Sequence, residues 1–376
     1  MLNTTQQKFF FNCINAAFVS VLMFGCGSSS SGKTDTPNVV KFLQGGTMQG
    51  SPLNLSTKVT TFAGSGTAGV VDGTGVAASI NGPVGMTTDG SCLYVADQIN
   101  HKIRKIVIAT GIVSTVAGTG VAGAVDGTGT AASFNFPYGI TNDGTNLYVS
   151  DQSNHKIRKI EIATGVVSTL AGSGVAGNGN GIGREAAFNS PADITTDGSN
   201  LYVTEPTSNR IRKIVIASGL VTSVAEIMPA IRGSAGGTVT VPLIFLPYGI
   251  TTDGSNLYVA YININEIRKI EIASGLVTTL AGSGAVGGTG TDASLHSPRG
   301  ITTDGSSLYV SENGSHKIRK IVIATGVVTT VAGSGVAGAV DGTGTAASFN
   351  QPYALTTDGS SLFVADNGNN KIRRIQ

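Results

Sequence analysis

Residues 137–172 read PYGITNDGTNLYVSDQSNHKIRKIEIATGVVSTLAG. Turn-forming residues such as Asp143 and Gly144 interrupt this stretch. Between the turns lie four short runs rich in β-branched and aromatic residues, at 138–141, 147–150, 157–162 and 166–170. Strand-length runs bounded by Gly, Asp and Asn predict antiparallel β-strands. The stretch therefore predicts one small four-stranded sheet.

The same unit recurs along the chain. Its second strand carries a Leu-Tyr-Val tag or a close variant, which begins at Leu93, Leu147, Leu201, Leu257, Leu308 and Leu362. Successive tags lie 51 to 56 residues apart. Four strands repeated at such a period are typical of β-propeller blades.

The two ends of the repeat region complement each other. Residues 58–64, KVTTFAG, are an isolated copy of a fourth strand, and the last unit stops at Gln376 after its third strand. Pairing the two would leave no open sheet edge between the first and last blades. We predict an all-β fold, a six-bladed β-propeller with four antiparallel strands per blade, closed by pairing the N-terminal strand with the C-terminal three.

The repeated pattern P-x-G-I-x-x-D-G-x-x-L-Y-V-x-D-x-x-N-x-K-I-R-K-I resembles NHL repeats, over about residues 58–376. The resemblance implies a propeller, commonly of six blades. Functions in that family range from protein or RNA binding to lyase and hydrolase chemistry, so the fold does not decide the function.

The composition excludes several classes of protein. The 376 residues carry a net charge of +2, with 12% charged and 40% hydrophobic residues, which argues against a disordered chain. A balanced charge lacks the basic field of nucleic-acid-binding proteins. We expect a monomer with no nucleic-acid partner.

The N-terminus resembles an export signal. Lys8 precedes an apolar run over residues 9–24, as in a secretory signal peptide. Cys26 follows a small residue and precedes a Ser-rich stretch, which resembles a bacterial lipobox and implies a lipidated Cys26. The alternative is ordinary signal cleavage nearby, with Cys26 incidental. We expect an exported lipoprotein of the outer membrane or cell surface, with a periplasmic location as the alternative.

Three parts of the chain follow from these observations. We expect a signal peptide at residues 1–25, a lipidated Cys and a flexible Ser/Gly-rich linker at 26–56, and the propeller at 57–376. Only Cys92 would remain in the folded body, so no intramolecular disulfide is expected there. We expect Cys92 to be a packed side chain, with a reactive thiol as the alternative.

An acidic residue stands seven positions before an Arg across the hairpin that joins the second and third strands. The pairs are Asp97 and Arg104, Asp151 and Arg158, Glu205 and Arg212, Glu312 and Arg319, and Asp366 and Arg373. This spacing brings the side chains together, and Arg suits a carboxylate contact. We interpret them as structural pairs rather than a basic ring for nucleic acid. The fourth unit has Tyr261 instead, so Arg268 needs another partner.

The remaining carboxylates and imidazoles are assigned to turns and loops. The Asp of each Asp-Gly turn suits local backbone bonding. Asp72, Asp126 and Asp341 lie one to a loop, which is poor for a calcium site, so we favour loop packing. His101, His155 and His316 occupy equivalent places in different units and do not converge on one metal. We expect no metal and no cofactor.

The candidate ligand site lies at one mouth of the central channel. The first strand of a blade lines that channel, and the residues after its leading Pro differ between units. We expect the ring of blades to bring these positions together as Tyr138, Asp193, Tyr248, Arg299 and Tyr353. Polar and aromatic groups that converge in a concave site suit a ligand. The alternative is that the Tyr side chains pack against loops and Arg299 pairs with Asp193 or solvent.

Residues 226–246 replace the usual Gly-rich connection with an apolar segment, which is expected either to contact a partner or to fill an interblade groove. We expect a non-catalytic binding or scaffold module for a protein, glycan or cell-envelope component, anchored to a membrane through its N-terminal lipid. The alternative is a propeller lyase or hydrolase with its site at the channel mouth. The sequence leaves enzyme activity undecided and favours its absence.

Overall fold

The computed structural model describes residues 41–42, 48–49, 52–226, 245–282 and 293–376. The expected signal peptide, Cys26 and most of the segment at 226–246 lie outside these residues. The short strands β1 (Lys41–Phe42) and β2 (Met48–Gln49) pair with each other. Within the described part of the chain, no helix is long and apolar enough to span a bilayer.

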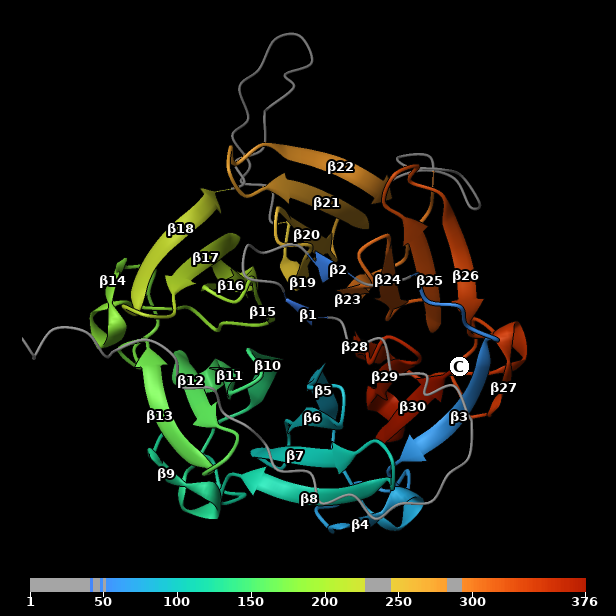
Figure 1. The fold of residues 1–376 in the computed structure, drawn as a ribbon, viewed down its shortest axis with the longest axis horizontal. Coiled ribbons are helices and arrows are strands. Elements are labelled where there is room, and N and C mark those ends of the chain that lie inside the picture. The colour runs from blue at the N-terminus through green and yellow to red at the C-terminus, as the bar shows by residue number, and fades with distance from the viewer. Residues whose placement is uncertain (1–40, 43–47, 50–51, 227–244, 283–292) are drawn as a thin grey trace, which may run out of the picture. The chain divides into compact units, whose positions relative to one another are not determined.

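Six antiparallel sheets stand in a ring around one axis (Figure 1), which confirms the predicted six-bladed propeller. The innermost strands are β5 (Pro83–Thr88), β10 (Pro137–Asn142), β15 (Ile194–Thr196), β19 (Pro247–Thr252), β23 (Pro298–Thr303) and β28 (Pro352–Thr357). The second strands are β6 (Cys92–Asp97), β11 (Asn146–Asp151), β16 (Asn200–Glu205), β20 (Asn256–Tyr261), β24 (Ser307–Glu312) and β29 (Leu362–Asp366). The third strands are β7 (Lys102–Val107), β12 (Lys156–Glu161), β17 (Arg210–Val215), β21 (Glu266–Glu271), β25 (Lys317–Val322) and β30 (Lys371–Ile375).

The outer strands complete the blades. They are β8 (Ile112–Ala117), β13 (Val166–Ala171), β18 (Leu220–Glu226), β22 (Val277–Gly282), β26 (Val328–Ala332) and β3 (Lys58–Ala63). Two-residue strands extend four of the sheets, namely β4 (Gly73–Thr74), β9 (Gly127–Thr128), β14 (Gly181–Ile182) and β27 (Gly342–Thr343). Single 3₁₀ turns follow these strands or lie in hairpins, as η1 (Gly75–Ala77), η2 (Gly129–Ala131), η3 (Gln152–Asn154), η4 (Gly183–Glu185), η5 (Pro206–Ser208), η7 (Gly344–Ala346) and η8 (Asn367–Asn369).

The ring closes as the sequence predicts. Strand β3 pairs with β30, with Val59 opposite Ile375, so one blade combines both ends of the repeat region. The chain just before β3 also packs on the ring, because the backbone N–H of Leu53 donates to Asp304 Oδ2 at 3.0 Å and the Leu53 side chain is buried. Closure removes the sheet edges that an open array would expose.

The hydrophobic core lies between neighbouring blades. Cys92 and Tyr94 of the first blade, for example, pack with Leu147 and Val149 of the second. Cys92 is a free, buried thiol, as the packing interpretation predicts. Burial raises the pKa of this thiol, which disfavours the reactive thiolate.

A buried guanidinium joins the hairpin of each regular blade to its outer loop. Arg104 Nη1 donates to Asp97 Oδ2 at 2.8 Å and to the carbonyl of Ser79, and its Nη2 donates to Asp72 Oδ1 at 2.7 Å. Arg104 and Asp97 are both fully buried. All five predicted pairs form, at Asp97 and Arg104, Asp151 and Arg158, Glu205 and Arg212, Glu312 and Arg319, and Asp366 and Arg373.

The loop carboxylates are the second partners of these guanidinium groups. Asp72, Asp126 and Asp341 bind Arg104, Arg158 and Arg373, each at 2.7 Å, which agrees with loop packing. These second ion pairs were not predicted from the sequence, because the partners lie 32 residues apart in the chain.

In the fourth blade, Tyr261 stands where the other blades have an acidic residue, and Arg268 has different partners. Arg268 Nε donates to Glu266 Oε2 at 2.8 Å. Its guanidinium carbon lies 4.9 Å from the Phe245 ring and 5.2 Å from the Tyr261 ring. The expectation that Arg268 needs another partner is confirmed, and a cation–π contact replaces part of the lost ion pair.

Neighbouring blades are also joined by hydrogen bonds at the hairpin tips. His101, His155 and His316 each accept, through Nδ1, a backbone N–H of the following blade at 3.0–3.1 Å. Asn265 and Asn370 each accept, through Oδ1, the corresponding backbone N–H of the following blade, from Ser297 and Gly82. The three His side chains therefore serve separate interblade contacts.

Asp97→Ala and Asp72→Ala test the two carboxylates that share Arg104. Asp97→Ala is expected to cost roughly 3–5 kcal/mol of unfolding free energy, because it leaves a buried cation without its buried partner. Asp72→Ala is expected to cost about 1 kcal/mol or less, since the Asp72 side chain is 53% exposed. Chemical denaturation measures both values, and equal costs would contradict the assigned role of burial.

Candidate binding channel

Four of the five predicted site residues meet at one end of the channel and bind one another. Arg299 donates from Nε and Nη2 to the Tyr138 hydroxyl at 3.1 and 3.0 Å. The Arg299 guanidinium carbon lies 4.6 Å from the Tyr248 ring centre and 3.9 Å from that of Tyr353. Burial raises the pKa of Tyr138, so its phenol stays neutral and can accept both bonds. We call Tyr138, Tyr248, Arg299 and Tyr353 the plug.

The plug leaves little room for a ligand. The cavity beside it measures about 10 Å³, which is space for about one water molecule. The described residues show no ion pair between Arg299 and Asp193, so that part of the alternative interpretation is wrong. A ligand-binding role for the plug residues stays a prediction.

Close approach of the inner strands explains the small residues that follow each plug position. A Cβ atom added at Gly249 or Gly300 would collide with the carbonyl oxygen of Arg299 or Tyr353 in the next blade. Glycine is therefore required for packing at these places.

Asp193 is the exception to this rule and departs from the local strand geometry. Strand β15 begins only at Ile194, whereas the other inner strands begin at Pro. The Asp193 carboxylate accepts the backbone N–H of Ile194 at 2.9 Å and that of Ile250 at 3.0 Å. Burial raises the pKa of Asp193 to about 7, although the two amide bonds oppose that shift.

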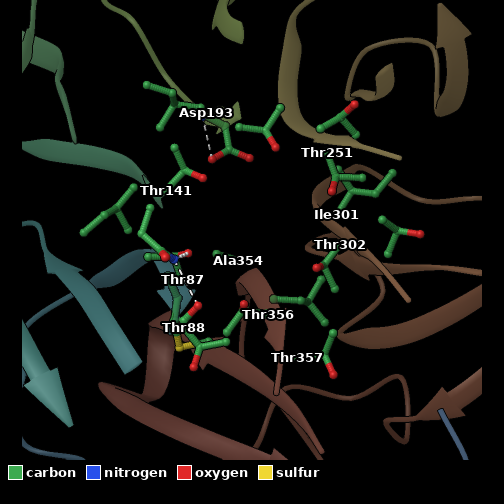
Figure 2. A pocket seen from close by; sticks show the side chains of 18 of the residues that line it. Thr87, Thr88, Thr141, Asp193, Thr251, Ile301, Thr302, Ala354, Thr356 and Thr357 are labelled. Carbon is green, nitrogen blue, oxygen red and sulfur yellow. Dashed lines mark hydrogen bonds between the residues drawn. The ribbon is translucent and has the colours of Figure 1, made fainter. Parts of the chain in front are cut away.

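A much larger cavity, of about 410 Å³, continues from Asp193 along the channel (Figure 2). An aliphatic ring of side chains surrounds its deeper part, formed by Met86, Ile140, Ile194, Ile250, Ile301 and Leu355. A ring of threonines follows at the next strand position, formed by Thr87, Thr141, Thr195, Thr251, Thr302 and Thr356. We call the second set the threonine ring.

The threonine ring was not among the site residues predicted from the sequence. Its signal is the Thr that follows the Ile, Met or Leu of each inner strand, six times in succession. The adjacent Thr has a different role, as Thr252 Oγ1 donates to the carbonyl of Asn256 and accepts the N–H of Gly254. Thr252 also lines the cavity, so two successive strand positions contribute threonines to its wall and only the second of them closes the turn.

The Asp-Gly turns form the outer end of the cavity. Asp143 Oδ1 accepts the N–H groups of Thr145 and Asn146, as predicted for a turn. Its Oδ2 accepts a hydrogen bond from the hydroxyl of Tyr148, a bond that was not predicted from the sequence. Asp89, Asp143 and Asp358 line the cavity, and Asp143 is exposed, so the cavity reaches solvent on this side.

Comparisons with known proteins agree with this architecture. NHL repeat-containing protein 2 from Bos taurus is 29% identical over 321 residues, which cover 75% of this chain and 44% of that protein. These findings support an NHL-type propeller. The chloroplastic protein SUPPRESSOR OF QUENCHING 1 from Arabidopsis thaliana is 32% identical over 268 residues, covering 65% of this chain and 25% of that protein. The chain thus spans less than half the length of both of these curated relatives.

The propeller also resembles solved structures. An auxiliary nutrient binding protein from Bacteroides thetaiotaomicron superposes with a TM-score of 0.63 at 18% identity, covering 85% of this chain and 76% of that one. Similarity at this level of identity shows the shared fold alone. No protein-family model matches the sequence.

Replacing Asp193 with Ala, the residue found at position 354 of the sixth blade, tests the raised pKa. Below about pH 4 the carboxyl is protonated in both folded and unfolded chains. Between about pH 4 and 7 only the folded chain holds the proton, so wild-type stability falls as pH rises through this window. Relative to the Asp193→Ala variant, the unfolding free energy of the wild type is expected to fall by roughly 2–4 kcal/mol between pH 4 and pH 8. Denaturant unfolding across this range measures the difference, and parallel pH profiles would contradict the assignment.

Proposed function

We propose that this NHL-type propeller is a non-catalytic binding module that holds a small polar molecule, or the end of a glycan, in the threonine-lined channel. The cavity of about 410 Å³ is the observation that carries the proposal. It falls within the roughly 300–1,000 Å³ of small-molecule sites, and hydroxyl groups converge on it from all six blades. The plug closes the inner end, so a ligand enters past the Asp-Gly turns.

Binding is favoured over lyase or hydrolase chemistry by the surroundings of Asp193. General acid–base and nucleophilic catalysis use a second group within hydrogen-bond reach of the first. Both oxygens of Asp193 accept backbone N–H groups, and the nearest ring of polar side chains consists of threonines. The shared fold with an auxiliary nutrient binding protein is consistent with this choice.

The threonine ring can be blocked by one substitution. Thr302→Trp is expected to fill the cavity, because Thr302 is the one half-buried member of the threonine ring and the other five are buried, and to abolish binding of any channel ligand. Thr329→Trp on the outer strand of the same blade is the matched control and is expected to bind normally. Thermal-shift screening of polar solutes and short glycans on the three proteins provides the measurement. A ligand that stabilises all three equally would exclude the channel as its site.

The proposal includes export and attachment to a membrane through a lipid on Cys26. It rests on the apolar run at residues 9–24 and on the Ser-rich stretch after Cys26. Cys26→Ser is expected to release the protein from the membrane fraction, because a lipid chain supplies the anchoring energy. Fractionation followed by immunoblotting measures the change, and a variant that stays with the membranes would show that the anchor is elsewhere.

A further inference from the structure

We propose that the channel binds a linear aliphatic diamine or polyamine, with one ammonium group at Asp193 and another at the turn carboxylates of the outer end. This inference rests on the proposed function of the cavity as a ligand site and specifies the ligand's chemistry. Three features of the cavity support it: a negative floor, an apolar and hydroxyl-lined wall, and a negative entrance.

The floor carries a carboxylate that the fold does not require. The equivalent positions of the other five blades hold Gly85, Gly139, Gly249, Gly300 and Ala354. Among the described residues, Asp193 makes no ion pair, and its side chain is partly exposed where it borders the cavity. A carboxylate held in a channel by backbone amides alone retains the capacity to bind an incoming cation.

Arg299 is not the cation that pairs with the Asp193 carboxylate. Its Nε and Nη2 are used by the Tyr138 hydroxyl, and its faces lie against Tyr248 and Tyr353. The plug that holds Arg299 lines the small cavity, whereas Asp193 borders both cavities. The side of Asp193 that faces the large cavity is therefore free for a ligand.

The entrance is negative as well. Asp89, Asp143 and Asp358 line it, and an Asp occupies the same turn in the other three blades. The basic side chains nearby stand on the third strands, farther from the axis, as Lys320 does over the Tyr309 ring at 5.8 Å. Carboxylates around a concave opening attract cations and raise their local concentration.

The distance between floor and entrance selects a linear ligand. Asp197 is the counterpart of the entrance carboxylates in the blade of Asp193, and it lies four positions after Asp193. A strand rises about 3.3 Å per residue, so the floor and the level of the turn carboxylates lie about 13 Å apart. The aliphatic ring and the threonine ring lie between them. A methylene chain suits the aliphatic ring, and ammonium groups at both ends suit the two carboxylate zones.

Isothermal titration calorimetry with 1,8-diaminooctane at pH 8, above the pKa of about 7 of Asp193, tests the inference with this carboxylate mostly ionised. The expected result is saturable binding to the wild type and to Thr329→Trp, and no binding to Thr302→Trp. Asp193→Ala is expected to weaken binding at least about tenfold, because the ligand loses its partner at the floor. Weaker binding is expected for 1-aminooctane and for 1,3-diaminopropane, which reach only one negative zone, and none for 1,8-octanediol.

Three outcomes would overturn the inference. The diol could bind as tightly as the diamine, the Asp193→Ala variant could retain full affinity, or Thr302→Trp could bind the diamine normally by adsorption at the outer carboxylates. If a neutral solute binds in a manner that Thr302→Trp abolishes while the diamine does not bind, the channel remains a binding site and only its cation preference is refuted. If Thr302→Trp affects no ligand of any kind, the proposed function fails as well.

Discussion

The propeller depends on one interaction, the ion pair between an Arg guanidinium buried inside the blade and a carboxylate of the same hairpin. Arg104 and its counterparts would be costly to bury alone, so each needs a carboxylate of its own hairpin, and a carbonyl of the loop beneath completes the contact. The requirement joins hairpin, loop and outer strand into one unit. Because no blade can bury both faces without its neighbours, six such units then depend on closure of the ring through β3 and β30.

Repetition supplies the scaffold, and departures from repetition supply the site. The threonine ring follows the six-fold pattern and would be symmetric by itself. Arg299 and Asp193 break that symmetry, since one closes the channel with three Tyr side chains and the other places a single carboxylate where its counterparts are Gly or Ala. The channel consequently has a closed end, a charged floor and an open end.

The sequence predicted part of the site well, because propeller symmetry places equivalent positions at equal height around one axis. On that basis Tyr138, Tyr248, Arg299 and Tyr353 were expected together, and they meet. The distances between these four side chains were not predictable. The same residues could form either a closed cluster, with the Arg299 guanidinium stacked on Tyr rings, or an open channel mouth. The loop carboxylate Asp72 was not paired with Arg104 for a related reason: the path of a Gly-rich loop depends on the sheet that it covers.

From the sequence alone follow the number of blades, the strand order, the closing pair and the hairpin ion pairs, because these depend on local turn chemistry and on spacing that repeats six times. The tertiary structure alone decided which end of the channel is closed, that threonines from all six inner strands line one cavity, and what surrounds Asp193. Those features depend on how side chains from six different blades pack together around the axis. A local sequence pattern within one blade does not determine that packing.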